Sequence, residues 1–183
     1  MQPIPEGRGF KVNEQQGKIR IYVACLASYN SGILHGSWID ACQDEDVIRY
    51  EINAMLMASP EKGAEEYAIH DHEGFMDVPI VEYQSIKSVI EIAVFIAEHC
   101  ALGGKLIEYY GNLSDADEAM NDHYAGVYSS LTNFAQELTE QSTEIPESLQ
   151  NYIDYERMAH DLEINDVLAI ETGFEQVHIF WIR

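Results

Sequence analysis

Lysine and arginine are scarce in this 183-residue sequence. It has ten of them against 32 aspartates and glutamates, which gives a formal net charge of −22 at pH 7. A nucleic-acid-binding protein needs a basic face that neutralises phosphates, and ten cations among 32 acids do not supply one. Nucleic-acid binding is therefore excluded as a function class.

The scarcity of cations is greatest in the second half of the chain. No Lys or Arg occurs between Lys105 and Arg157, and residues 106–182 carry 16 acids against one cation. Intramolecular salt bridges cannot neutralise these acids, and their mutual repulsion costs stability. Something other than folding must account for them.

Further absences bear on where the protein acts. Its three cysteines, Cys25, Cys42 and Cys100, include no C-x-x-C pair, which is typical of free thiols in a reducing cytosol, and acids beside Cys42 disfavour a reactive thiolate. No apolar run approaches the length of a membrane span, and residues 1–18 lack the apolar centre of a signal peptide. We expect a cytoplasmic protein with no membrane segment and a flexible leader at residues 1–18.

Motifs for catalysis and cofactor binding are also missing. No G-x-S-x-G, P-loop, G-x-G-x-x-G or H-E-x-x-H occurs, and carboxylates are too common for any pair to indicate an acid-base dyad. The His-Asp-His-Glu run at residues 70–73 is the best metal-like cluster. On a strand, however, adjacent side chains point to opposite faces and cannot share one ion, so a turn with polar side chains is the preferred interpretation. Asp115 and Asp117 begin like a calcium loop, yet its sixth and twelfth positions are Met120 and Gly126. We expect no catalytic, cofactor or metal site.

The apolar fraction of 46% indicates a folded chain despite the charge. Strands predicted over residues 19–26 and 65–71, with a helix over 44–58, make residues 19–84 an N-terminal α+β domain. Glycine, serine and asparagine in the segment 27–37 indicate a loop or turn.

The next residues predict helices. Ser85 is a suitable N-cap for a helix over residues 86–100, which the glycine pair at 103–104 ends. Ser114 opens a further short helix. Residues 85–120 are therefore predicted to form a helical middle domain.

Residues 121–183 predict a C-terminal α+β domain. Apolar side chains at three- and four-residue spacing indicate a long helix over 124–138, and Pro146 fits the start of a second helix. The segments 166–172 and 176–181 predict a closing β-hairpin.

Carboxylates at helical spacing are the most informative feature. Three or four residues apart on a helix, they stand about 5–6 Å from each other, the order of the charge spacing along a nucleic-acid backbone. Glu137, Glu140, Glu144 and Glu147 have this spacing as far as their helix continues. The 22 excess charges correspond to about 37 Å of duplex, close to the diameter of a compact chain of this length. Composition alone leaves a binding role and a merely solvated acidic surface equally open.

Three blocks of sequence follow one another along the chain and cover most of residues 19–183: Tyr29-Asn30-x-Gly32-x-Leu34-x-Gly36-x-Trp38, Glu65-Glu66-Tyr67-Ala68-Ile69-His70-Asp71, and Pro146-x-Ser148-Leu149-Gln150-Asn151-Tyr152-Ile153-Asp154-Tyr155 with Asp161-Leu162 after it. Together they resemble the antirestriction protein ArdA family. The resemblance implies an elongated α+β chain of three small domains, at residues 19–84, 85–120 and 121–183. It also implies that the protein is not an enzyme.

The resemblance further implies a homodimer joined through the C-terminal domain and an imitation of bent B-form DNA. Such proteins occupy the DNA-binding groove of type I restriction-modification enzymes and protect incoming mobile DNA from cleavage. A dimer seam would then lie near the closing hairpin, whose apolar residues are otherwise read as core: Val177, Ile179, Phe180 and Trp181.

The predicted site is an acidic surface that takes the place of DNA phosphates: Asp115, Asp117, Glu118, Asp122, Glu137, Glu140, Glu144, Glu147, Asp154, Glu156, Asp161 and Glu163. Lys and Arg of the restriction enzyme would meet these carboxylates, so binding would be competitive with DNA and would weaken with salt. The alternative is an acidic cytosolic domain, salt-adapted or metal-binding, whose charge only provides solubility.

Overall fold

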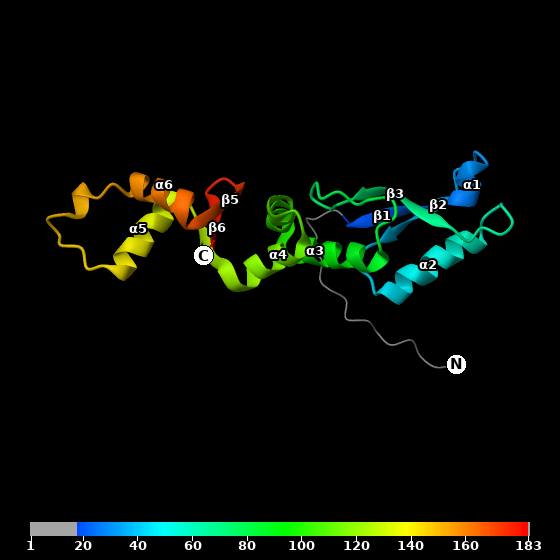
Figure 1. Ribbon diagram of the computed structural model, residues 1–183, viewed down its shortest axis with the longest axis horizontal. Coiled ribbons are helices and arrows are strands. Elements are labelled where there is room, and N and C mark those ends of the chain that lie inside the picture. The colour runs from blue at the N-terminus through cyan, green and yellow to red at the C-terminus, as the bar shows by residue number, and fades with distance from the viewer. Residues whose placement is uncertain (1–17, 183) are drawn as a thin grey trace, which may run out of the picture. The chain divides into compact units, whose positions relative to one another are not determined.

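The computed structural model describes residues 18–182, so the predicted leader lies outside the described residues except for Lys18. The fold is mixed α+β with two small antiparallel sheets, which confirms the predicted class at that level. The chain divides into two compact units between Gly104 and Lys105. We name residues 18–104 the N-terminal unit and residues 105–182 the C-terminal unit (Figure 1). The three-domain division with borders at 84 and 120 stays a prediction.

The N-terminal unit is built on a sheet of three antiparallel strands in the order β2-β1-β3. They are β1 (Arg20–Cys25), β2 (Gly36–Asp40) and β3 (Tyr67–Glu73), and β1 and β3 confirm the two predicted strands. The helix α2 (Glu45–Met57) packs beside this sheet (Figure 1). It buries the apolar stripe that predicted it, namely Ile48, Ile52, Met55 and Leu56.

A short helix, α1 (Leu26–Asn30), occupies part of the segment predicted as a loop. Gly32 follows it with a φ of +77°, so the glycine that indicated a loop lies just beyond a helical turn. Ser28 is fully buried in α1, and its Oγ lies 2.8 Å from the Ser59 Oγ. This contact ties α1 to the segment that follows α2.

The range α3 (Ile86–Tyr110) comprises two helices that meet at a break at Cys100, so the first of them ends where the predicted helix over 86–100 ends. The Ser88 backbone N–H donates to Ser85 Oγ at 3.2 Å, which confirms the predicted N-cap. The glycine pair, which was expected to end the helix, lies inside the second helix instead. A Cβ on Gly104 would lie 2.6 Å from the Met76 Cβ, so this glycine permits close packing instead. The one non-helical residue within α3 is Cys100, with φ 55° and ψ −136°.

The C-terminal unit begins with the end of α3 and with α4 (Leu113–Glu118), followed by a π-helix, η1 (Ala119–His123). Its sheet has the order β4-β6-β5, and all neighbours are antiparallel. Two helices accompany this sheet, α5 (Leu131–Ser142) and α6 (Tyr155–Asn165). The buried cluster consists of Phe134, Val167, Val177 and Ile179.

The closing hairpin is confirmed as β5 (Val167–Gly173) and β6 (Gln176–Trp181). The apolar residues of β6 are core, because Val177, Ile179 and Phe180 are buried and Trp181 packs at 5.7 Å, ring centroid to ring centroid, against Phe134.

The predicted helix over 124–138 is wrong in its first part, which forms the strand β4 (Tyr124–Tyr128). Pairing with β6 decides the conformation, and Tyr124 lies opposite Phe180. Gly126 has a φ of +129°, which a helix does not accommodate. The helix begins only after Ser130, whose Oγ accepts the Asn133 backbone N–H at 3.0 Å.

The helix predicted to start near Pro146 begins instead at Tyr155. Residues 143–154 contain only a short 3₁₀ turn, η2 (Gln150–Tyr152). Asp154 supplies the cap, since its Oδ1 accepts the Arg157 backbone N–H at 3.0 Å.

Among residues 18–182, no helix is both long enough and apolar enough to span a membrane.

Candidate functional site

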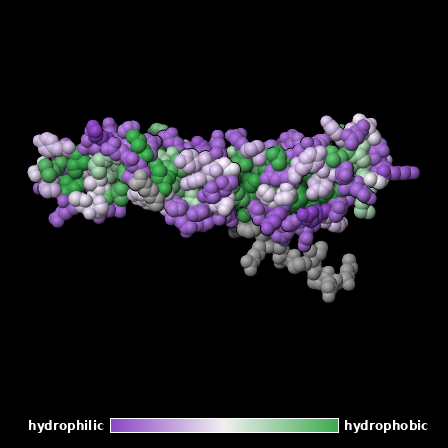
Figure 2. Space-filling view, in the orientation of Figure 1, coloured by the Kyte–Doolittle hydropathy of each residue, from purple (hydrophilic) through white to green (hydrophobic). Residues whose placement is uncertain are grey.

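The acidic surface, by which we mean the twelve predicted acids, lies wholly in the C-terminal unit, and all twelve side chains are exposed. Figure 2 shows hydrophilic residues over much of the visible face, with apolar patches among them. The twelve are placed as follows: Asp115, Asp117 and Glu118 on α4, Asp122 on η1, Glu137 and Glu140 on α5, Glu144 and Glu147 after α5, Asp154 before α6, and Glu156, Asp161 and Glu163 on α6.

None of these carboxylates forms an ion pair with a lysine or arginine of the described chain. The C-terminal unit offers only Lys105 and Arg157 as described cations. Unpaired, exposed carboxylates keep their charge available to a partner. Every Lys or Arg ion pair whose two residues both lie within 18–182 is in the N-terminal unit: Arg20 with Glu73, Arg49 with Glu45, and Lys87 with Glu91.

Helical spacing holds over only part of the acidic surface. Because α5 ends at Ser142 and Thr143 is extended, the prediction of one helical row through Glu144 and Glu147 is wrong. Glu137 and Glu140 keep the three-residue spacing. The acidic surface is therefore an assembly of short helical rows and connecting segments.

Three acids of this surface accept hydrogen bonds from neutral donors. Asn112 Nδ2 donates to Asp115 Oδ2 at 2.9 Å, and Gln136 Nε2 donates to Glu140 Oε1 at 2.8 Å. Asp154 caps α6 through the backbone N–H described above. A neutral donor orients a carboxylate without cancelling its charge, so these contacts preorganise the negative surface.

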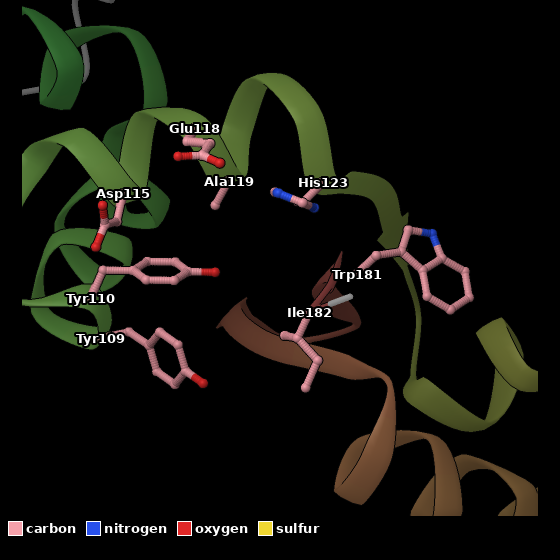
Figure 3. A pocket seen from close by; sticks show the side chains of 8 residues that line it. All are labelled: Tyr109, Tyr110, Asp115, Glu118, Ala119, His123, Trp181 and Ile182. Atoms are coloured by element: carbon pink, nitrogen blue, oxygen red, sulfur yellow. The ribbon is translucent and has the colours of Figure 1, made fainter.

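A pocket of about 320 Å³ opens within the C-terminal unit beside two of the acids. Figure 3 shows the side chains that line it: Tyr109, Tyr110, Asp115, Glu118, Ala119, His123, Trp181 and Ile182. Burial raises the pKa of Tyr110, and the negative charge of Tyr109, Asp115 and Glu118 raises it further. Burial is the largest cause of this shift in pKa, and the two carboxylates add to it.

Sequence reasoning missed this pocket apart from its two acids. Trp181 was assigned to the core, and the end of α3 was placed before Tyr109 and Tyr110. The only signal in the sequence was the pair of tyrosines just before Asp115. Ile182 is distant in sequence and reaches the pocket only when the chain folds.

The metal-like run at residues 70–73 does not converge on one point. His70 packs edge-on against Tyr29, while Glu73 pairs with Arg20 at 2.8 Å. His72 packs instead against Phe75. No group of three or more His, Cys, Asp or Glu residues in the described range could hold a metal ion.

Comparison with known proteins bears on the identity of the chain. A family model described as Antirestriction protein (ArdA) matches residues 21–176, which is most of the sequence. A search of curated proteins found no match. Members of the family inhibit restriction-modification enzymes and are not themselves enzymes. The chain belongs to the ArdA antirestriction protein family.

Proposed function

We propose that this protein mimics the charge of B-form DNA and occupies the DNA-binding groove of type I restriction-modification enzymes. The observation that carries the proposal is the acidic surface itself, twelve exposed carboxylates with no Lys or Arg ion pair among the described residues. Such a surface costs stability through self-repulsion, and a basic partner relieves that cost.

The mechanism follows from the chemistry of the two surfaces. Lys and Arg side chains of the enzyme that would otherwise bind phosphates bind carboxylates of this chain, so one partner excludes the other. Recognition by charge uses no base edges, and it therefore acts on enzymes of different sequence specificity. The energy is spread over many exposed contacts, each worth roughly 0.2–1 kcal/mol, and screening by salt weakens all of them.

The proposal includes an elongated homodimer of three-domain chains, joined through the C-terminal domain. Two chains carry 44 excess negative charges, the charge of about 75 Å of duplex. Exposed apolar side chains on the C-terminal unit, among them Val127, Ile164 and Phe174, offer surface for such a contact. The three cysteines are free thiols, as expected of a protein that acts in the cytoplasm.

A cleavage assay with a purified type I enzyme tests the proposal. Added protein is expected to slow cleavage of a plasmid that carries the target site, and raising the plasmid concentration is expected to relieve the inhibition. Inhibition that does not respond to DNA concentration would contradict occupation of the groove. No inhibition at low salt would favour the alternative, in which the charge only provides solubility.

A further inference from the structure

The pocket at the end of α3 combines two kinds of wall. Tyr109 and Tyr110 meet edge to face, with centroids 4.9 Å apart, and Figure 3 shows both rings on one side of the hollow. Asp115 and Glu118 stand next to Tyr110, on the helix α4. An aromatic wall beside carboxylates suits a ligand that is both flat and cationic.

The acids of this pocket are held in place. The Asp115 backbone N–H donates to Asn112 Oδ1 at 2.9 Å, which caps α4, and Asn112 Nδ2 donates back to the Asp115 carboxylate at 2.9 Å. The α4 helix places Glu118 three residues further on, above the same hollow. Among residues 18–182, no lysine or arginine lines the pocket, and none forms an ion pair with Asp115 or Glu118.

The size of the pocket limits the ligand. A volume of about 320 Å³ is at the small end of the range of ligand pockets, about 300–1,000 Å³. It admits one side chain but no folded segment. A phosphate is excluded by the two carboxylates, and a purely apolar group would leave those carboxylates desolvated without a partner.

We propose that this pocket receives the guanidinium of an arginine from the target restriction enzyme. A guanidinium stacks on a phenol ring and donates to two carboxylates at once, whereas a lysine ammonium lacks the flat face. The inference rests on the proposed function, because it makes the pocket one fixed contact within an otherwise diffuse acidic surface. Burial is the largest cause of the raised pKa of Tyr110, and the charges of Asp115 and Glu118, which raise it further, also attract a cation.

The test uses the full chain alone, labelled with nitrogen-15, and a small probe in place of the enzyme. Nα-acetyl-argininamide is titrated at about pH 8, where free imidazole is neutral. The lysine and citrulline analogues serve as controls for shape and charge. The arginine probe is expected to saturate and to shift the amide signals of Ala119, His123 and Ile182. It is expected to leave those of Glu137 and Glu140 on α5 unchanged.

Matched variants assign the binding to the pocket. The double variant Asp115→Asn, Glu118→Gln removes two charges at the pocket and is expected to weaken the arginine probe roughly tenfold or more, because two charge-assisted hydrogen bonds are lost. The double variant Glu171→Gln, Glu175→Gln removes two exposed charges elsewhere in the unit and is expected to change the affinity by less than about twofold. Tyr110→Leu is expected to reduce the preference for arginine over lysine.

Two results would overturn the inference. One is equal weakening by both double variants, or equal shifts on α5 and around the pocket, which indicates diffuse attraction to an acidic protein. The other is no saturable binding of the arginine probe. Neither result touches the proposed function, because the cleavage assay reports that separately and needs no pocket.

Discussion

The two units of this protein handle their acids in different ways. Residues 18–104 contain 14 acids and five cations, and three Lys or Arg ion pairs form among them, with Arg20 and Glu73 at 2.8 Å. Residues 105–183 contain 16 acids and three cations, and none of the twelve acids of the acidic surface is paired within the described chain. The N-terminal unit uses part of its charge for itself, whereas the C-terminal unit keeps its charge exposed.

Apolar burial stabilises the fold of both units, whereas the exposed acids of the C-terminal unit are available for binding a partner. Both units bury an apolar core between a three-stranded sheet and helices, and neither core contains an Asp or Glu side chain. Apart from Asp154, which caps α6, the acids of the acidic surface therefore contribute nothing to the core of the C-terminal unit. Their repulsion is a cost that binding to a basic groove relieves.

The largest expected effect comes from neutralising the whole acidic surface. Changing its twelve acids to Asn or Gln is expected to weaken inhibition of a type I enzyme by about several hundredfold, since twelve contacts of about 0.3 kcal/mol sum to roughly 3.6 kcal/mol. The melting temperature is expected to rise, because repulsion is removed. Inhibition curves and thermal melts measure the two effects.

The matched control for that variant lies in the N-terminal unit. Glu45→Gln, Glu73→Gln and Glu91→Gln together break its three ion pairs and are expected to lower thermal stability slightly while inhibition is retained. Loss of inhibition in this control, with inhibition retained in the variant that changes all twelve acids, would show that the N-terminal unit carries the inhibitory charge.

A substitution in the core, with a free-energy cost similar to that of losing the acidic surface, tests whether the two units fold separately. Phe134→Ala removes a ring that packs against Tyr128 and Trp181, and it is expected to cost about 3–5 kcal/mol. Hydrogen exchange is expected to accelerate throughout the C-terminal unit and to stay unchanged in β1. Ile48→Ala in the buried face of α2 is the reciprocal variant, and uniform acceleration in either variant would indicate one cooperative unit.

A smaller effect is expected from only four of the acids. Changing Glu137, Glu140, Glu144 and Glu147 to Gln is expected to weaken inhibition about tenfold, because the energy is distributed over many screened contacts. Complete loss of inhibition by a variant with an unchanged circular dichroism spectrum would contradict a distributed surface.

The smallest effect concerns a single acid beside a thiol in the N-terminal unit. Burial raises the pKa of Cys42 to about 11, and the negative charge of Asp40 contributes to the shift. Since a raised pKa keeps the thiol protonated, alkylation of Cys42 is expected to be slow near neutral pH and to accelerate only as the pH approaches 11. Asp40→Asn is expected to move that profile slightly lower, as peptide mapping of the alkylated site would measure. An unshifted thiol with ordinary reactivity would contradict the burial of Cys42.

Local patterns predicted the elements whose signals are local. The stripe on α2, the Ser85 cap and the hairpin of β5 and β6 each depend on residues close in sequence, and the structure confirms them. The exposure of the acidic surface also followed from composition, because so many charges cannot be buried.

Elements decided by distant partners were mispredicted. Tyr124 to Tyr128 fits a helical spacing, but β6, some fifty residues later, draws it into a sheet. In the sequence, Gly104 indicates the end of a helix. In the structure, it allows Met76 to pack closely against the helix. The pocket likewise needs Ile182 beside Tyr110, a proximity that no local pattern contains.

Displacement of DNA from a purified type I enzyme shows whether this protein and DNA compete for the same groove. A fluorescent duplex bound to the enzyme is titrated with this protein at low salt, and its anisotropy is followed. The anisotropy is expected to fall to the value of the free duplex, and higher salt is expected to suppress this displacement. A duplex that remains bound while the protein also joins the complex would contradict the claim that carboxylates take the place of phosphates.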